Sequence, residues 1–457
     1  MSTAPSRFAE RREALRRRRR RRRRLAAVAA ALVVVALVAV IGPWFGHLGL
    51  LWPGGGAGAS SAAGDEGPVR VSGADGAWHA EPVTLRFRDP EGEVIAAGWR
   101  LDGGAWREGR VARVPAPADH SGDGVRTVDV RPIGSTDVTG SVEVRIDTTP
   151  PEVGAVKAAP DRIDGVGDVR LLFAVEPGEE GVTVEWAVVD ALDKPVGEHG
   201  EPQAPSGPVS LTWKARTAEG EPLGPGTYWL RVRARDAAGN VAEQRAAIAC
   251  DRPVKARVIT DLPEAGRMVA LTFDGGSGYA WRNMMNTLHA RGAKGTFFCT
   301  GVSVDRYPEM ARLAVEQGHT IANHSYDHPD FGAISHTEAI RQLDANSDAW
   351  WKACRAIPQP FFRPPYGSYT DATVKAAGEA GYLYVVQWTG DTGDWSGSSS
   401  RQVTANALAA ARPGAIIVFH TQWNSAEALP AILKGLEKKN LKAVSMAELC
   451  EAAGLPY

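Results

Sequence analysis

The stretch MVALTFDGG, residues 268 to 276, decides the fold of the C-terminal part of this chain. Its first six residues carry no charge and predict a buried strand, and Asp274 follows directly in a Gly-rich loop. Further apolar runs follow, separated by stretches with helical spacing: GTFFC, YLYVVQW and AIIVF. We therefore expect repeated βα units that form a parallel sheet or distorted (β/α) barrel, with its chemistry at the carboxyl ends of the strands.

Polar side chains follow the predicted strands at five consecutive places. They are Asp274, His324 with His328, Arg363, Asp391 with Asp394, and His420. Each has an ordinary alternative: two histidines four residues apart often share a face by chance, and an arginine can be a structural ion pair. Their recurrence at strand ends predicts a catalytic site.

Five short motifs appear in the order typical of one enzyme family. They are TFDGG (272–276), HSYDH (324–328), RPPYG (363–367), DTGDW (391–395) and IVFH (417–420). The region from about 268 to 450 resembles the polysaccharide deacetylases of carbohydrate esterase family 4. The resemblance implies a distorted (β/α) barrel, hydrolysis of N-acetyl groups, and a divalent metal, usually zinc, held by an Asp and two His.

The resemblance also implies roles for individual residues. His324 and His328 would hold the metal, which polarises the amide carbonyl and acidifies water. Asp274 would act as general base, and Arg363 would keep its carboxylate ionised and oriented.

A second group of residues would serve the leaving group and the substrate. The backbone N–H of Tyr366 would bind the oxyanion, and His420, kept protonated by Asp394, would protonate the leaving amine. Trp395 and Val418 would line the slot for the acetyl group, with plain core packing as the alternative for both.

Gly275 departs from the family pattern. The first motif is usually TFDDG, and its second acid is the third metal ligand, whereas Gly275 supplies no side chain. Two histidines could hold the metal with water or with another acid, namely Asp274, Asp327 or Asp391. Alternatively, the site has lost its metal. Because the remaining motif residues are present, we favour a metal-dependent enzyme with an altered ligand set.

The region before the predicted barrel has a period of two. Val83, Leu85 and Phe87 alternate with polar residues, and so do Val209 and Leu211. A weak repeat of about 90 residues predicts two β-sandwiches. The segments IDTTPP (146–151) and RDAAGN (235–240) resemble those of bacterial immunoglobulin-like surface modules, which usually act as spacers.

The N-terminus combines a basic run with an apolar segment. Residues 1–24 hold twelve Arg and two Glu, a charge of +10, so the total of −1 leaves −11 for the rest. Eighteen uncharged residues follow, 25–42, which is close to the length of a membrane span. We expect an uncleaved anchor with its basic flank in the cytoplasm. The alternative, nucleic-acid binding, is disfavoured by the acidic remainder.

Composition and cysteine spacing restrict the class of protein and the kinds of cysteine site. Hydrophobic residues make up 44% and charged residues 23%, as in globular proteins. The four cysteines, Cys250, Cys299, Cys354 and Cys450, have no CxxC spacing, which disfavours a zinc ribbon. An extracellular location permits disulfides, and buried free thiols are an equal alternative.

These observations predict one layout and one function. The segments are a cytoplasmic tail (1–24), an anchor (25–45), a Gly-rich linker (46–67), two Ig-like sandwiches (68–148 and 149–252) and a deacetylase domain (262–457). We expect a membrane-anchored, outward-facing enzyme that removes N-acetyl groups from an envelope polysaccharide, most simply peptidoglycan, and binds no nucleic acid. The alternative is a non-catalytic glycan-binding or scaffold protein. The motifs are compatible with three substrates: N-acetylglucosamine, N-acetylmuramic acid and an O-acetylated polymer.

Overall fold

The computed structural model describes residues 67–175, 181–204, 207–276 and 278–457. The predicted tail, the anchor and all but the last residue of the predicted linker lie outside these described residues. Within them, none of the helices combines the length and apolar character needed to cross a membrane.

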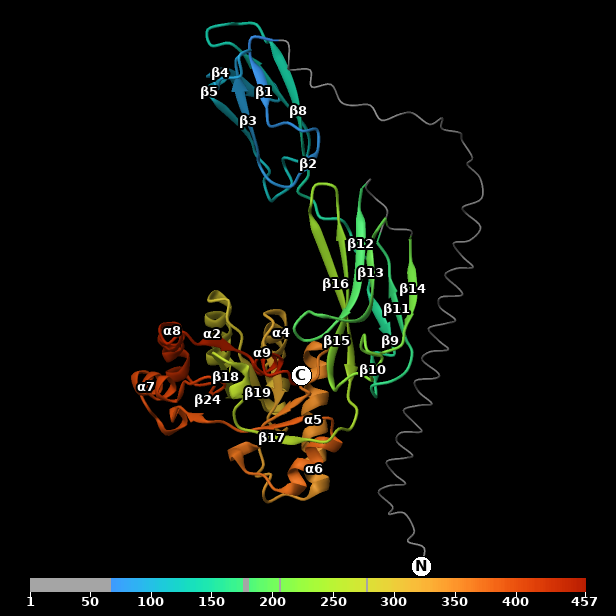
Figure 1. The fold of residues 1–457 in the computed structure, drawn as a ribbon, viewed down its shortest axis with the longest axis vertical. Coiled ribbons are helices and arrows are strands. Elements are labelled where there is room, and N and C mark those ends of the chain that lie inside the picture. The colour runs from blue at the N-terminus through green and yellow to red at the C-terminus, as the bar shows by residue number, and fades with distance from the viewer. Residues whose placement is uncertain (1–66, 176–180, 205–206, 277) are drawn as a thin grey trace, which may run out of the picture. The chain divides into compact units, whose positions relative to one another are not determined.

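The first β-rich region has two sheets around one core (Figure 1). The sheets have the orders β1-β3-β6 and β2-β8-β7-β4-β5. The strands are β1 (Arg70–Ser72), β2 (Trp78–His79), β3 (Val83–Arg88), β4 (Ala97–Leu101), β5 (Arg107–Gly109), β6 (Val111–Val114), β7 (Gly124–Arg131) and β8 (Gly140–Ile146). Leu85 and Phe87 of β3 point into the core with Val130 and Ile146 of the second sheet. The predicted alternation is confirmed.

The second β-rich region repeats this arrangement. Its sheets have the orders β10-β16-β15-β12-β13 and β14-β11-β9. The strands are β9 (Lys157–Ala159), β10 (Arg162–Ile163), β11 (Val169–Phe173), β12 (Thr183–Val189), β13 (Pro195–Gln203), β14 (Val209–Trp213), β15 (Gly226–Arg235) and β16 (Val241–Cys250). Both sheets contribute to one core, for example Leu171 from β11 and Leu230 from β15. The two regions therefore share a two-sheet construction.

The C-terminal region is built on a nine-stranded sheet in which every described strand pair is parallel. The order is β17-β22-β21-β20-β19-β18-β24-β23, with β25 beside β18. The strands are β17 (Arg257–Ile259), β18 (Met268–Gly275), β19 (Thr296–Cys299), β20 (Thr320–Asn323), β21 (Phe361–Phe362), β22 (Tyr384–Val386), β23 (Gly390–Asp391), β24 (Ile416–His420) and β25 (Lys442–Val444). Among the described strands the order does not return to β17, so the expected distorted (β/α) barrel takes the form of a curled parallel sheet that does not close fully.

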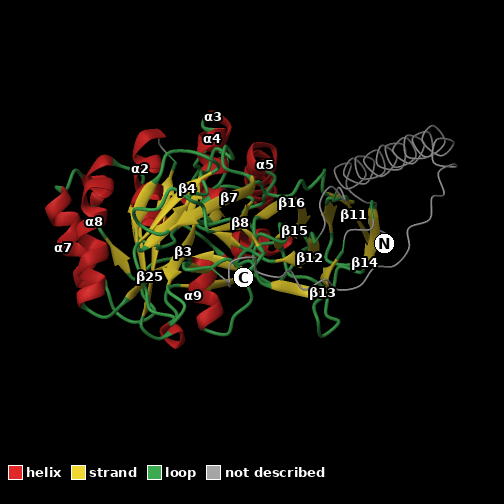
Figure 2. Ribbon diagram, turned by 90° about the horizontal axis from the view of Figure 1, so that it is seen from above, coloured by secondary structure: helices red, strands yellow, loops and turns green. Residues whose placement is uncertain are grey.

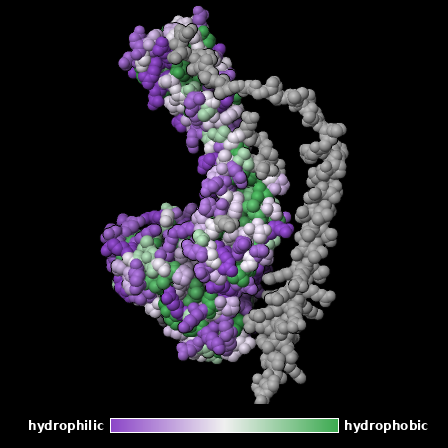
Figure 3. Space-filling model, turned by 45° about the vertical axis from the view of Figure 1, so that its right-hand side comes forward, coloured by the Kyte–Doolittle hydropathy of each residue, from purple (hydrophilic) through white to green (hydrophobic). Residues whose placement is uncertain are grey.

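Helices connect these strands and cover the sheet. They are α2 (Gly278–Ala290), α3 (Gly301–Arg306), α4 (Pro308–Glu316), α5 (His336–Cys354), α6 (Asp371–Glu379), α7 (Ser400–Ala410), α8 (Trp423–Lys438) and α9 (Met446–Ala452). Figure 2 shows α2, α7 and α8 side by side against the strands. Apolar side chains are collected in the cores, and the surface in Figure 3 is mostly hydrophilic with smaller apolar patches.

The register of the parallel sheet brings the predicted site residues to one edge. Asp274 of β18 lies opposite His420 of β24, and Asp391 of β23 lies opposite Val418. On the other side of β18, Asn323 of β20 is followed directly by His324. The residues predicted for the site therefore lie at the carboxyl ends of the strands.

All four cysteines are free thiols. Cys250, Cys299 and Cys450 are buried and Cys354 is partly buried.

Candidate active site

Arg363 and Asp274 form a buried ion pair at the centre of the site. The Nη1 of Arg363 donates to Asp274 Oδ1 over 2.7 Å and to Thr272 Oγ1 over 2.9 Å. The guanidinium also lies 4.2 Å above the ring of Phe298. Arg363 is fully buried and Asp274 is 4% exposed, so each charge is compensated by the other. The predicted orienting role of Arg363 fits this geometry.

Asp394 and His420 form a second acid–base pair. Asp394 Oδ1 contacts His420 Nδ1 at 2.8 Å, and Asp394 Oδ2 accepts from the backbone N–H of His420 over 2.6 Å. Burial lowers the pKa of His420, but the hydrogen bond to Asp394 and the charges of Asp274, Asp394 and Asp391 outweigh it and raise that pKa above its usual value. His420 is therefore suited to give up a proton as an acid near neutral pH.

The buried Asp394 is itself held by the start of α8. The Ser425 hydroxyl donates to Asp394 Oδ2, and Asn424 Nδ2 donates to the Asp394 backbone carbonyl over 2.9 Å. Burial raises the pKa of Asp394, yet hydrogen bonds from His420 and Ser425 bring it below its usual range. The carboxyl therefore stays ionised beside His420. Ser425 and Asn424 carry no recognisable motif and were missed by sequence reasoning.

His324 and His328 lie side by side beyond β20, with ring centroids 5.0 Å apart. The Nδ1–H of His324 donates to the carbonyl of Arg363 over 2.8 Å, so Nε2 keeps its lone pair and lies 3.9 Å from Asp274 Oδ2. Burial lowers the pKa of His324 to about 4, against the opposing charge of Asp274. Burial also lowers the pKa of His328. Both imidazoles are therefore neutral at pH 7, as metal ligands must be.

The two histidines lie on a loop, not on a helix face. Ser325 and His328 have φ of 66° and 70°, a left-handed conformation that costs energy for residues with a Cβ. The Ser325 hydroxyl accepts from the His328 N–H over 3.0 Å. The surrounding structure thus fixes a strained loop that turns both rings toward the site.

Two buried amides of α5 hold this loop. Gln342 Oε1 accepts from the backbone N–H of Tyr326 over 2.9 Å and of Asp327 over 3.1 Å. Asn346 Nδ2 donates to the carbonyls of Cys299 and Ser325 over 2.8 and 2.6 Å. Sequence reasoning missed both amides, because their burial is visible only in the structure.

Gly275 leaves space that a neighbouring side chain partly fills. Its φ is 110°, and a Cβ at this position would lie 3.1 Å from Thr421 Oγ1. The Thr421 hydroxyl accepts from the backbone N–H of Gly276 over 2.8 Å. A larger residue at 275 would therefore need both an unfavourable backbone conformation and a shift of Thr421.

The residues fit a divalent cation in part. His324 and His328 offer two neutral imidazoles, the usual nitrogen ligands of zinc. The described part of the chain contains no group of three or more His, Cys, Asp or Glu that could hold a metal ion. Asp327 is engaged by Gln342 through a 2.7 Å hydrogen bond, and Asp391 accepts from Gly393 N–H over 2.8 Å. The described residues thus show two histidine ligands where catalytic zinc sites usually have three protein ligands. Asp274, with Oδ2 3.9 Å from His324 Nε2, is an alternative acid that lies beside them.

The remaining predicted residues differ in exposure. Tyr366 has φ of 60° in the turn Pro365–Gly367, and its ring lies edge-on to His328 at 4.7 Å. Trp395 is 61% exposed, so core packing does not explain it. Val418 belongs to β24 and is 2% exposed, so core packing is a sufficient explanation for this residue.

Comparison with known proteins gives one consistent family. A model of polysaccharide deacetylase matches residues 261–385. A peptidoglycan-N-acetylglucosamine deacetylase of Bacillus cereus is 30% identical over 191 residues, which cover 40% of this chain and 69% of that protein. A chitooligosaccharide deacetylase of Bradyrhizobium sp. is 34% identical over 163 residues, 35% of this chain and 74% of that protein. A solved peptidoglycan N-acetylglucosamine deacetylase is 29% identical, with a TM-score of 0.40 over 42% of this chain and 92% of its own. The chain belongs to the polysaccharide deacetylase family.

Proposed function

We propose that this protein is a membrane-anchored, metal-dependent deacetylase that hydrolyses N-acetyl groups of cell-envelope polysaccharide outside the cytoplasm. Peptidoglycan N-acetylglucosamine is the proposed main substrate, because a relative that acts on it covers the same domain. The observation that carries the proposal is that the buried Arg363–Asp274 pair and the partly buried Asp394–His420 pair lie at the neighbouring ends of β18 and β24.

Amide hydrolysis needs a base for water, a charge to stabilise the oxyanion and an acid for the leaving amine. A divalent cation, proposed as zinc, bound by His324 and His328 would polarise the carbonyl and lower the pKa of water. Asp274, oriented by Arg363, takes the proton from the attacking water.

His420, on the neighbouring strand β24, is proposed to deliver a proton to the leaving group. His420 carries its proton on the ring because Asp394 stabilises the imidazolium, and it donates this proton to the departing nitrogen. The Tyr366 backbone N–H is proposed to bind the oxyanion, and the exposed Trp395 is proposed to face the acetyl group with Val418 behind it.

Acetate release from N-acetylglucosamine oligomers and from purified peptidoglycan tests the enzyme proposal. The wild type should release acetate, and His420→Asn should lose about 10²-fold or more of this activity. Equal release by both proteins would contradict the assigned chemistry.

The absence of a ligand side chain at Gly275 favours a second candidate function. The protein would then be a non-catalytic glycan-binding protein with the same fold. Wild-type protein that binds N-acetylglucosamine oligomers, yet releases no acetate with zinc, cobalt or manganese present, would support this candidate and overturn the first.

The anchor 25–45 and the two-sheet regions, proposed as Ig-like spacers, would carry the enzyme outward from the membrane. Protease added to intact cells should digest the C-terminal domain. Protection in intact cells, lost when the cells are opened, would place that domain in the cytoplasm and overturn this topology.

A further inference from the structure

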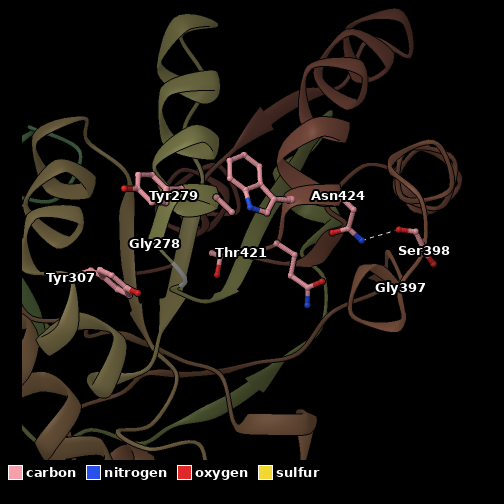
Figure 4. Close-up of a pocket in the computed structure, with 10 residues that line it drawn as sticks. Gly278, Tyr279, Tyr307, Gly397, Ser398, Thr421 and Asn424 are labelled. Atoms are coloured by element: carbon pink, nitrogen blue, oxygen red, sulfur yellow. Dashed lines mark hydrogen bonds between the residues drawn. The ribbon is translucent and has the colours of Figure 1, made fainter.

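A surface hollow of about 680 Å³ lies directly beside the catalytic strand ends (Figure 4). We call it the neutral hollow. It is lined by the start of α2, the start of α8 and two loop segments: Gly278, Tyr279, Ala280, Tyr307, Gly397, Ser398, Thr421, Gln422, Trp423 and Asn424. Its volume falls within the range of about 300–1,000 Å³ that is typical of ligand sites.

The neutral hollow is connected to both acid–base pairs. Thr421 follows His420, and its backbone N–H donates to the carbonyl of Asp274 over 3.0 Å. Asn424 on the other wall donates to the carbonyl of Asp394 over 2.9 Å. A molecule bound in the hollow would therefore be a direct neighbour of the group that reacts at His420.

Two large aromatic side chains of the hollow are exposed. Tyr279 is 78% exposed and Trp423 is 57% exposed, although each could bury far more apolar surface. Figure 4 shows Tyr279 and Tyr307 on one side of Thr421, with Asn424 and Ser398 on the other. Aromatic rings that face hydrogen-bonding amide and hydroxyl groups are typical of binding sites, because such rings offer rigid contact area.

The lining contains no Asp, Glu, Lys, Arg or His. Tight recognition of phosphate or carboxylate groups normally uses Arg or Lys side chains in direct contact, and none lines the hollow, although α2 and α8 begin there. The lining therefore favours an uncharged ligand that presents both hydroxyl or amide groups and a flat C–H face. A pyranose ring has these properties.

The neutral hollow also continues away from the site. Trp423 lines a second hollow of about 400 Å³ between α2 and α8, together with the amides Asn283 and Asn286. Trp423 thus borders two adjacent hollows. A glycan chain of several sugars could extend from one hollow into the other.

From these features we propose that the neutral hollow is a sugar subsite, which binds the uncharged N-acetylated hexose next to the one that is deacetylated, by stacking on Trp423 and Tyr279. This inference rests on the proposed function, since it assigns a binding site to the sugar beside the one that is deacetylated. It makes Trp423 and Tyr279 determinants of substrate length, with no part in the chemical step.

The test compares N-acetylglucosamine dimer with monomer in wild type, Trp423→Ala and Trp423→Phe, because the dimer is the shortest substrate that reaches the neutral hollow. Trp423→Ala should lower kcat/KM for the dimer about fivefold or more and leave the monomer value unchanged, and Trp423→Phe should lie between. Tyr369→Ala, an exposed tyrosine outside the lining, is the matched control and should behave as wild type. An equal loss on monomer and dimer, or no loss on either, overturns the proposal.

Direct binding separates this inference from the proposed function. If the wild type releases no acetate, the proposed enzyme activity fails, and titration of wild type and Trp423→Ala with the tetramer still tests the subsite. Weaker binding by Trp423→Ala, with an unchanged thermal midpoint, supports it. Equal binding overturns it.

Discussion

The acid–base side and the ligand side of the site differ in how many contacts fix their side chains. On the acid–base side, Arg363 fixes Asp274 through a buried ion pair, and Asp394 fixes His420 through a partly buried hydrogen bond. On the ligand side, formed by His324, His328 and Gly275, one backbone carbonyl orients His324, and Gly275 adds no side chain. The contacts of the proposed proton-transfer residues are therefore set by the fold, whereas the proposed metal site depends on a loop and on a further ligand.

The largest expected effect comes from breaking the Arg363–Asp274 pair. Arg363→Met leaves the Asp274 charge buried without a partner, so the free energy of unfolding should fall by about 3–5 kcal/mol. Chemical denaturation measures this change. Adding Asp274→Asn removes the stranded charge and should restore part of the stability but no activity. A double variant as unstable as the single one would mean that the loss comes from packing.

Asp394→Asn should slow acetate release by about 10²-fold, because His420 loses the charge that keeps it protonated. An acid must hold its proton, so a lower His420 pKa moves the alkaline limb of the pH–rate profile to lower pH. Asp391→Asn is the matched control, since the exposed Asp391 also acts on His420 but makes no hydrogen bond to it. Equal shifts in the two variants would remove the special role of Asp394.

Gln342→Ala tests the support of the ligand side. Loss of the amide frees the loop N–H groups of Tyr326 and Asp327, and we expect zinc affinity to fall about tenfold. Isothermal titration with zinc measures it, and Arg341→Ala on the exposed face of α5 is the control. Unchanged affinity would show that the loop holds its shape without Gln342.

The smallest effect is expected for Gly275→Asp. A new carboxylate should tighten zinc binding, but φ of 110° and the contact with Thr421 Oγ1 oppose it. We expect a net gain of less than about tenfold and a metal-free protein destabilised by about 1 kcal/mol. Thr421→Ala in the same chain should enlarge the gain. If the single variant binds zinc as tightly as the double, Thr421 is no obstacle.

Sequence reasoning predicted that Asp274 and His420 lie close together, because parallel strands bring their carboxyl ends to one edge, and the register of β18 and β24 places them opposite each other. It also found the alternating core residues of the β-rich regions, such as Leu85 and Phe87. It missed side chains that act through other elements. Gln342, Asn346 and Ser425 lie on helices, and nothing in their spacing indicates which loop they hold.

The ligand side shows a second limit. The sequence identifies Gly275 as a missing acid, but the proximity of Thr421 depends on the register between β18 and β24. The left-handed conformation of His328 depends on the loop as a whole. How far the distorted barrel closes was likewise not predictable, because closure depends on pairing between strands far apart in the chain.

We propose that a cation held by His324 and His328 enables the acid–base pairs to hydrolyse an N-acetyl group. The most direct test of this proposal is a zinc titration of metal-stripped protein, with acetate release from N-acetylglucosamine tetramer and zinc binding measured together. We predict that wild type regains activity as zinc binds, and that His324→Ala neither binds zinc with that affinity nor regains activity. Full activity of the metal-stripped wild type, or zinc binding unchanged in His324→Ala, would contradict the account.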